Sequence, residues 1–249
     1  MKGLTGLLWF SMAVWAQHAL TPPEVGFILD SRSHVYPVNG LAGNFVLGLA
    51  AGSGIISAAF FGAFRLSKTD SALSVVNQRG RIVARMEAPP GPALFAFSAN
   101  GSPAIAYFPQ SKTLRVWDGR EFRAGPDFDQ EVLGVGAQGE FVVQRDGELW
   151  ELQVDLRSGA IVSQAALPGI APPVLMLAGQ LVYRDSHGLV IRRTDGSEKH
   201  IAAHLPANIA FGQMGGAWVQ ITDLATGRLS ALNAQRKHEA YYLLPEVRQ

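Results

Sequence analysis

Six positions that recur every 36–40 residues carry the side chains with the clearest potential for chemistry. Five of them are aspartates. If equivalent turns of a repeat project from one face, these carboxylates form a ring that attracts a cation or a basic peptide loop. Asp also stabilises turns, because its side chain hydrogen-bonds the turn backbone, and that structural role is the alternative. The positions are Asp30, Asp70, Gln110, Asp146, Asp185 and Asp223.

Two smaller groups could in principle hold a metal ion. The segment "PDFDQE" at 126–131 has acids at alternate positions, Asp127, Asp129 and Glu131. Calcium takes six to eight oxygen ligands, so a solvated loop is the favoured interpretation. His200 and His204 share one face of an expected strand because their separation is even. Without a nearby Glu on that segment, they are interpreted as two surface histidines.

The composition excludes several classes of function. The chain has 249 residues and no cysteine, so disulfides, thiolate metal sites and Cys nucleophiles are absent. The net charge is +1, and no basic run exceeds Arg192–Arg193, so no surface for nucleic acid is expected. No nucleophile elbow, phosphate-binding loop or zinc-protease motif occurs. We therefore expect no cofactor and no metal.

A repeat of glycines positions these side chains. Each glycine precedes a run rich in β-branched and aromatic residues, as in "GEFVVQRDG" at 139–147. The intervals between them are 36, 39, 38, 40 and 37 residues. The series is Gly26, Gly62, Gly101, Gly139, Gly179 and Gly216.

A second series, of Asn and Asp residues that end strand-like runs, keeps the same phase. Its intervals are 38, 41, 37, 40 and 38 residues. Asn and Asp tolerate turn conformations, and Asn-Gly or Asp-Gly is a strong hairpin signal. Two independent series in one phase indicate a true repeat. The members are Asn39, Asn77, Asp118, Asp155, Asp195 and Asn233.

Each repeat resolves into four short strands, best seen in residues 173–206. Six four-stranded antiparallel units of this length predict an all-β fold, a β-propeller of six blades. The alternative is five blades and a partial blade, because only "HALTPPEV" precedes Gly26 where the first strand of blade one is expected. We expect the C-terminal segment "EAYYLLPEV" and the N-terminal residues to share that strand.

One repeat carries a family resemblance. The segment "TLRVWDGREF" at 113–122 resembles the third strand of a WD-repeat blade, and "QVDLRSGAIV" at 153–162 resembles strands of bacterial extracytoplasmic propeller proteins. The resemblance covers residues 25–246 as architecture. It implies the propeller fold and no particular activity.

The charge-free run at 46–64, "VLGLAAGSGIISAAFFGAF", is long enough to span a membrane. In the repeat frame it is the fourth strand of blade one, a small-residue linker and the first strand of blade two. First strands of blades are packed on both faces and read as continuous apolar runs. We therefore predict two strands and no stable membrane span.

The N-terminus predicts an extracytoplasmic location. Lys2 precedes an apolar stretch from Leu4 to Trp15, and Val14 and Ala16 occupy the positions that a signal peptidase reads. We expect residues 1–16 to be a secretory signal and residues 17–249 to form a single propeller domain in the periplasm or outside the cell.

The function indicated is a binding or scaffolding module. It would act as a monomer that takes a protein or a small ligand at one propeller face. The alternative is a propeller lyase or hydrolase with a polar site at one channel mouth. Such enzymes need converging carboxylates or histidines, whereas the channel strands offer mainly Ser57, Ser98 and Gln213.

Overall fold

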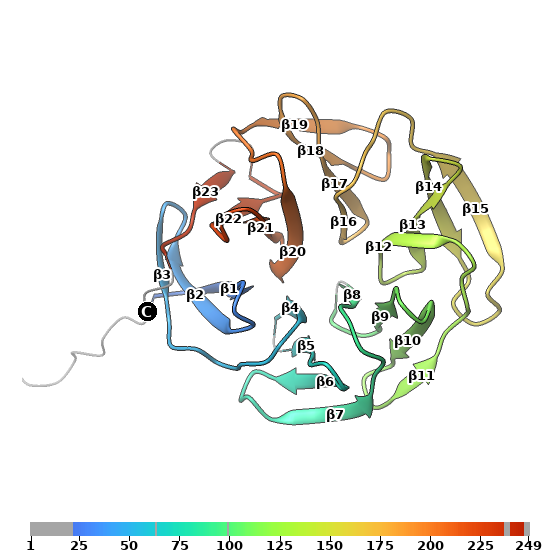
Figure 1. The fold of residues 1–249 in the computed structure, drawn as a ribbon, viewed down its shortest axis with the longest axis horizontal. Coiled ribbons are helices and arrows are strands. Elements are labelled where there is room, and N and C mark those ends of the chain that lie inside the picture. The colour runs from blue at the N-terminus through green and yellow to red at the C-terminus, as the bar shows by residue number, and fades with distance from the viewer. Residues whose placement is uncertain (1–21, 63, 99, 237–239, 247–249) are drawn as a thin grey trace, which may run out of the picture.

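The computed structural model describes residues 22–62, 64–98, 100–236 and 240–246. The expected signal segment 1–16 lies outside these residues. The described chain consists of strands and turns arranged as a ring of six sheets around a central axis (Figure 1). The predicted six-bladed β-propeller is confirmed. No helix among the described residues is long and apolar enough to cross a membrane.

The first three blades follow the chain in order, and the strands of each sheet are antiparallel. Blade one comprises β1 (Glu24–Leu29), β2 (Val35–Leu41) and β3 (Asn44–Leu47). Blade two comprises β4 (Ser57–Phe61), β5 (Phe64–Lys68), β6 (Ala72–Asn77) and β7 (Ile82–Glu87). Blade three comprises β8 (Leu94–Phe97), β9 (Ala104–Phe108), β10 (Thr113–Trp117) and β11 (Phe122–Ala124).

The last three blades repeat the four-stranded order. Blade four comprises β12 (Glu131–Val135), β13 (Glu140–Arg145), β14 (Glu148–Val154) and β15 (Ile161–Ala166). Blade five comprises β16 (Val174–Leu177), β17 (Gln180–Arg184), β18 (Gly188–Arg192) and β19 (Glu198–Ala202). Blade six comprises β20 (Ile209–Gly215), β21 (Trp218–Asp223), β22 (Leu229–Asn233) and β23 (Tyr241–Leu243).

The apolar run at 46–64 folds as the repeat frame predicts. Its first two residues end β3 of blade one, residues 57–61 form β4 of blade two, and Gly62 follows β4 in the turn to β5, which begins at Phe64. An isolated antiparallel β-bridge between Val35 and Gly52 holds the linker between these strands against β2. The composition that resembles a membrane helix therefore belongs to two short strands.

Outside blade one, both sequence series mark turns, as predicted; Gly26 and Asn39 lie within strands β1 and β2. The glycines from Gly62 onward have positive φ, 50° at Gly62 and 93° at Gly139, a region that a side chain disfavours. Members of the Asn/Asp series accept backbone hydrogen bonds in the turns between third and fourth strands. Asp118, for example, accepts from the N–H groups of Arg120 and Glu121 at 2.9 and 3.1 Å.

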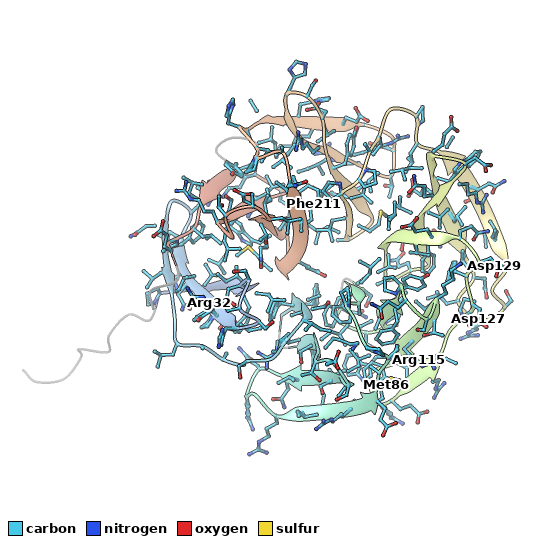
Figure 2. All side chains as sticks on the ribbon, viewed as in Figure 1. Arg32, Met86, Arg115, Asp127, Asp129 and Phe211 are labelled. Atoms are coloured by element: carbon cyan, nitrogen blue, oxygen red, sulfur yellow. The ribbon has the colours of Figure 1, made fainter. Side chains whose placement is uncertain are left out.

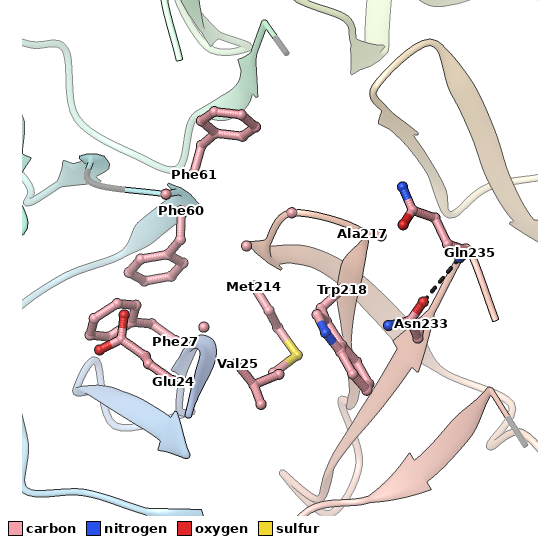
Figure 3. Close-up of a pocket in the computed structure, with 14 residues that line it drawn as sticks. Glu24, Val25, Phe27, Phe60, Phe61, Met214, Ala217, Trp218, Asn233 and Gln235 are labelled. Atoms are coloured by element: carbon pink, nitrogen blue, oxygen red, sulfur yellow. Dashed lines mark hydrogen bonds between the residues drawn. The ribbon is translucent and has the colours of Figure 1, made fainter. Parts of the chain in front are cut away.

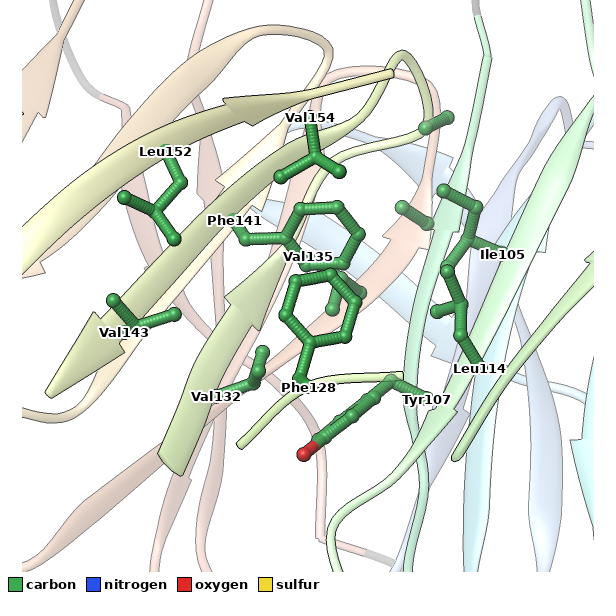
Figure 4. Close-up of a cluster of buried hydrophobic side chains, with 12 residues drawn as sticks. Ile105, Tyr107, Leu114, Phe128, Val132, Val135, Phe141, Val143, Leu152 and Val154 are labelled. Carbon is green, nitrogen blue, oxygen red and sulfur yellow. The ribbon is translucent and has the colours of Figure 1, made fainter. Parts of the chain in front are cut away.

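Each interface between neighbouring blades buries its own apolar cluster. Figure 4 shows the cluster between blades three and four, where Phe128 packs against Tyr107 and Phe141. The ring centroids of Phe128 and Phe141 are 4.4 Å apart. Because adjacent faces bury one another, the ring is held together by packing between blades, not by one common core.

Blade one differs from the others. Its sheet has three strands within the described residues, and the innermost one, β1, matches the second strand of the other blades. The expectation that the C-terminal segment helps to supply the missing first strand is wrong, because β23 pairs with β22 and completes blade six. The inner strands β20 and β4 contact each other directly, in front of blade one.

Candidate functional site

The five predicted aspartates lie in or next to the turns between second and third strands, where the repeat frame places them. These turns share one face of the ring, which we call the aspartate face. Three of the carboxylates stabilise their own turns. Asp30 accepts from the N–H groups of Arg32 and His34 at 3.0 and 2.8 Å. Asp185 and Asp223 accept comparable bonds in their own turns.

At Asp185 and Asp223 these turn bonds favour the ionised form of the carboxylate. The backbone hydrogen bond from His187 holds the pKa of Asp185 below its ordinary value. The hydroxyl hydrogen bond from Thr226 does the same for the pKa of Asp223. A structural role is therefore present at these turns, and binding of a cation or a basic peptide to the ring stays a prediction.

The other two aspartates behave differently. Asp146 has a φ of 50° and occupies a left-handed position in its turn. At Asp70 the backbone carbonyl accepts a hydrogen bond from Nζ of Lys68 at 3.0 Å, and the carbonyl of Thr69 accepts another at 2.7 Å. Lys68 is fully buried. Desolvation lowers the pKa of its ammonium, an effect that the nearby Asp70 carboxylate opposes.

The acidic segment 126–131 serves as an anchor. Phe128 is 7% exposed and enters the cluster between blades three and four, while Asp127 and Asp129 on either side of it are exposed (Figures 2 and 4). Lys112 donates from Nζ to the carbonyl of Asp129 at 2.6 Å. The alternation of acidic and apolar residues thus places one aromatic ring inside and two carboxylates in solvent.

The two histidines are both exposed. His200 lies in β19, with Nδ1 3.3 Å from a carboxylate oxygen of Asp185 and Nε2 3.6 Å from one of Glu198. His204 follows the end of that strand. Within the described ranges, no group of three or more His, Cys, Asp or Glu side chains has the arrangement of a metal site.

Two of the three polar residues expected on the channel strands make structural hydrogen bonds, and the third, Gln213, is 7% exposed. The hydroxyl of Ser57 accepts from the N–H of Ala93 at 2.9 Å. The hydroxyl of Ser98 donates to the side-chain oxygen of Asn100 at 2.7 Å. Both bonds fix loops next to the inner strands and leave these hydroxyls committed to the fold.

A pocket of about 430 Å³ opens where blades six, one and two meet, on the face opposite the aspartate face (Figure 3). We call it the seam pocket. Its volume lies in the range of small-molecule sites, about 300–1,000 Å³. Its wall comes from β1, from the end of β4 and from the β20–β21 turn. The lining residues are 24–27, 60–62, 214–218, Asn233 and Gln235.

Aromatic rings form two sides of the seam pocket. On one side Phe27 and Phe60 stack with centroids 4.9 Å apart and an interplanar angle of 19° (Figure 3). On the other side lies Trp218, whose indole packs edge-to-face on Phe45 at 5.5 Å. Because each ring is held by a neighbour, the walls are pre-formed for a flat or apolar group.

Polar groups stand at the edge of these aromatic walls. Figure 3 shows the carboxylate of Glu24 beside the ring of Phe27, and the amides of Asn233 and Gln235 on the far side. The side-chain oxygen of Asn233 accepts from the N–H of Gln235 at 3.0 Å, which fixes that turn. Partial burial raises the pKa of Glu24 above its ordinary 4.5.

A smaller cavity of about 100 Å³ adjoins the seam pocket. It shares Glu24, Phe27 and Gly62 with the seam pocket, and it reaches outward between blades one and two to Arg65. The burial of Arg65 lowers the pKa of its guanidinium. The guanidinium of Arg65 thus lies beyond the carboxylate of Glu24, in the cavity between blades one and two.

The pocket exists because of how the ring closes. Blade one has no described strand in the inner position, so the inner ends of β20 and β4 meet in front of β1. Gly26 of β1 touches β20 so closely that a Cβ there would overlap the carbonyl oxygen of Met214. The space left beyond this contact, under the β20–β21 turn, is the seam pocket.

Gln220, a residue of blade six, joins this blade to blade one through side-chain hydrogen bonds. Its side-chain oxygen accepts from the N–H of Leu29 at 2.9 Å, and its Nε2 donates to the carbonyl of Leu29 at 2.7 Å. The amide therefore pairs with β1 as a backbone peptide of a neighbouring strand would. Gln220 is 8% exposed, whereas Leu29 is half-buried, so both bonds are only partly shielded from water.

A second cleft, of about 310 Å³, lies at the blade six–blade one junction on the aspartate face. It is bounded by the turns at 30–32 and 226–228 and by the segment 243–246. Its charges are mixed: Asp30 and Glu246 face the same space as Arg32 and Arg228. Of the five predicted site aspartates, Asp30 alone lines one of these three clefts.

Sequence reasoning missed the seam pocket. Trp218 is the first residue of strand β21, yet it forms a pocket wall. Gln220 does differ from its equivalents in the sequence. It lies three residues before Asp223, and the corresponding position of every other repeat holds a residue other than Gln. Those residues are Phe27, Ser67, Tyr107, Val143 and Val182.

Fold and pocket together define a β-propeller with a cavity at its closing junction. The sequence matches no family model and no curated protein. Among solved structures, the chain is similar to the WD40 domain of Neurospora crassa Pan2, with 9% identity, a TM-score of 0.48, and coverage of 90% of this chain and 80% of that one.

Two further structures resemble it at the same level. Kuenenia stuttgartiensis hydrazine synthase has 13% identity and a TM-score of 0.47, with 93% of this chain and 84% of that one covered. Kluyveromyces lactis Hsv2 has 14% identity and a TM-score of 0.45, with 74% and 61% covered. These likenesses concern the fold alone.

Proposed function

We propose that this protein is a binding module whose ligand site is the seam pocket. The observation that carries the proposal is a pocket of about 430 Å³ with two pre-formed aromatic walls. Apolar pockets of this size with a few polar groups at the rim are the usual form of small-molecule sites. The ligand therefore has an apolar or aromatic body that inserts between the Phe27–Phe60 pair and Trp218.

The location proposed for this module is outside the cytoplasm. The support is the sequence of residues 1–16, with Lys2, an apolar stretch and small residues at Val14 and Ala16. Export of the full-length chain should yield a mature protein that starts at Gln17. N-terminal sequencing of the exported protein checks this, and a start at Met1 contradicts it.

Saturation-transfer NMR with benzyl alcohol, a small neutral aromatic probe, tests the pocket. The wild-type protein should transfer magnetisation to the probe, and Trp218 emission should change on titration. Ala217 lines the pocket, so Ala217→Phe fills it and should abolish both signals. Leu224→Phe is the matched control, because Leu224 is 62% exposed on the aspartate face.

The outcomes separate the alternatives. Loss of the signals in Ala217→Phe with retention in Leu224→Phe supports the seam pocket. Equal signals in both variants place the probe elsewhere and overturn the proposal. Thermal melting of each variant confirms that the comparison is made on folded protein.

A further inference from the structure

Two opposite charges near the seam pocket lack partners of their own. Within the described residues, neither the carboxylate of Glu24 nor the guanidinium of Arg65 makes an ion pair or a side-chain hydrogen bond. The Nε of Arg65 is fully buried without a hydrogen-bond partner. Nearly all buried polar groups in proteins are hydrogen-bonded, so this exception calls for an explanation.

The fold holds both charges next to one space. Arg65 lies in β5 directly opposite Phe60 of β4, the residue whose ring forms the pocket wall. Glu24 begins β1 across the blade one–blade two interface and lines both cavities. From one end to the other, the space therefore presents a cation at Arg65, an anion at Glu24, and then the aromatic walls.

Arg65 is half-buried and Glu24 lies exposed at the rim, but both charges lose part of their hydration. Desolvation raises the pKa of Glu24 and lowers the pKa of Arg65, which shows that each charged form is disfavoured by its surroundings. A ligand that supplies the opposite charge to each group relieves both penalties. A carboxylate also matches the planar fork of an arginine, which binds it through two parallel hydrogen bonds.

We propose that the seam pocket and its adjoining cavity bind a free α-amino acid with an apolar or aromatic side chain. Its carboxylate pairs with Arg65, its ammonium with Glu24, and its side chain enters the aromatic pocket beside Phe27 and Phe60. The inference rests on the proposed function, because it assigns the ligand class of the same pocket. The three chemical features of the site match the three parts of one small zwitterion.

Isothermal titration at pH 7 with four related probes tests the assignment. L-Phenylalanine carries both charges, 3-phenylpropanoate lacks the ammonium, phenethylamine lacks the carboxylate, and benzyl alcohol carries neither. L-Phenylalanine should bind tightest, and loss of either charged group should weaken binding at least tenfold. A tenfold loss corresponds to about 1.4 kcal/mol, a modest value for a partly desolvated ion pair.

Variants assign each charge to its residue. In Glu24→Gln, L-phenylalanine and 3-phenylpropanoate should bind equally, because the group that recognises the ammonium is gone. In Arg65→Met, L-phenylalanine and phenethylamine should bind equally, and Arg65→Lys should restore part of the difference. Glu87→Gln and Arg85→Met, both at exposed positions of β7, are the matched controls and should leave all four affinities unchanged.

The pH dependence provides a second readout. Because the pKa of Glu24 lies above 4.5 in the free protein, L-phenylalanine should bind more weakly as pH falls through that pKa. Binding at such pH should release a proton, since the ammonium stabilises the carboxylate. Glu24→Gln should remove this pH dependence.

Each outcome decides one of the two proposals. If benzyl alcohol binds in the pocket as tightly as L-phenylalanine, the amino-acid assignment is wrong and the proposed function stands. If the preferences for the charged groups persist unchanged in Glu24→Gln and Arg65→Met, the assignment is also wrong. If none of the four probes binds, or if Ala217→Phe leaves their binding intact, both proposals fail.

Discussion

The closing junction of the ring should owe part of its stability to a single amide side chain, beside the apolar cluster that it buries. Gln220 joins blade six to blade one through two hydrogen bonds with the backbone of Leu29, at 2.9 and 2.7 Å. Gln220→Leu keeps a side chain of similar size but removes both bonds, together with the one that Nε2 donates to the hydroxyl of Thr222 at 2.8 Å within blade six. The N–H and carbonyl of Leu29 are then left facing an apolar side chain.

The expected loss of stability follows from those two bonds. A backbone hydrogen bond contributes about 0.5–1.5 kcal/mol net, and an orphaned buried group costs about 1–3 kcal/mol. Leu29 is only half-buried, so water reaches part of its backbone. We therefore use the net value for each bond and expect a loss of about 1–3 kcal/mol in the free energy of unfolding.

Urea denaturation measures this change, and hydrogen exchange locates it. The amide of Leu29 should lose protection in Gln220→Leu while amides of blade four keep theirs. Gln153→Leu is the matched control, because Gln153 also donates to a backbone carbonyl, that of Gln138 at 2.8 Å, but at an exposed site within one blade. A loss below about 0.5 kcal/mol in Gln220→Leu, or equal losses in both variants, would refute the role of the amide in closure.

Three further predictions concern packing and titration. Gly26→Ala should destabilise the fold by about 1–3 kcal/mol in urea denaturation, because its Cβ overlaps the backbone of β20, whereas Gly212→Ala on that strand should be tolerated. Phe128→Ala should lower the free energy of unfolding by about 3–5 kcal/mol, and a loss under 1 kcal/mol would contradict its anchoring role. Burial, and then a hydrogen bond to Glu198, raise the pKa of Tyr183 from 10.0 to about 12. The stability that this tyrosine contributes is therefore fully present below pH 10 and is lost as the pH rises to about 12. The absorbance of the phenolate should show that Tyr183 titrates at high pH, and Glu198→Gln should lower the pH at which it titrates.

The blades could be predicted because their signals are local. A tight turn needs glycine at positive φ, and a turn closed by an Asn or Asp side chain needs that residue at one position. These requirements recur with each blade, so Gly139 and Asp118 can be recognised without knowledge of their neighbours in space. The apolar run at 46–64 was assigned to two strands for the same reason, since Gly62 falls in phase with the other turn glycines.

The seam pocket could not be predicted in this way. Its walls come from residues near the beginning, the second repeat and the last repeat, such as Phe27, Phe60 and Trp218. Each of these looks like an ordinary core residue of its own strand. Their convergence depends on how the ring closes at blade one, where the regular pattern is broken.

The sequence by itself determined the number of repeats, the strand order within each blade and the turns that join them, because each depends on residues close together in the chain. The tertiary structure decided which strands meet at the junction, how Gln220 fastens it, and that Glu24 and Arg65 lie beside one cavity. These features arise from contacts between residues far apart in the chain, such as Leu29 and Gln220, which are 191 positions apart. No local pattern encodes such a distance, so the closure of the ring creates the site.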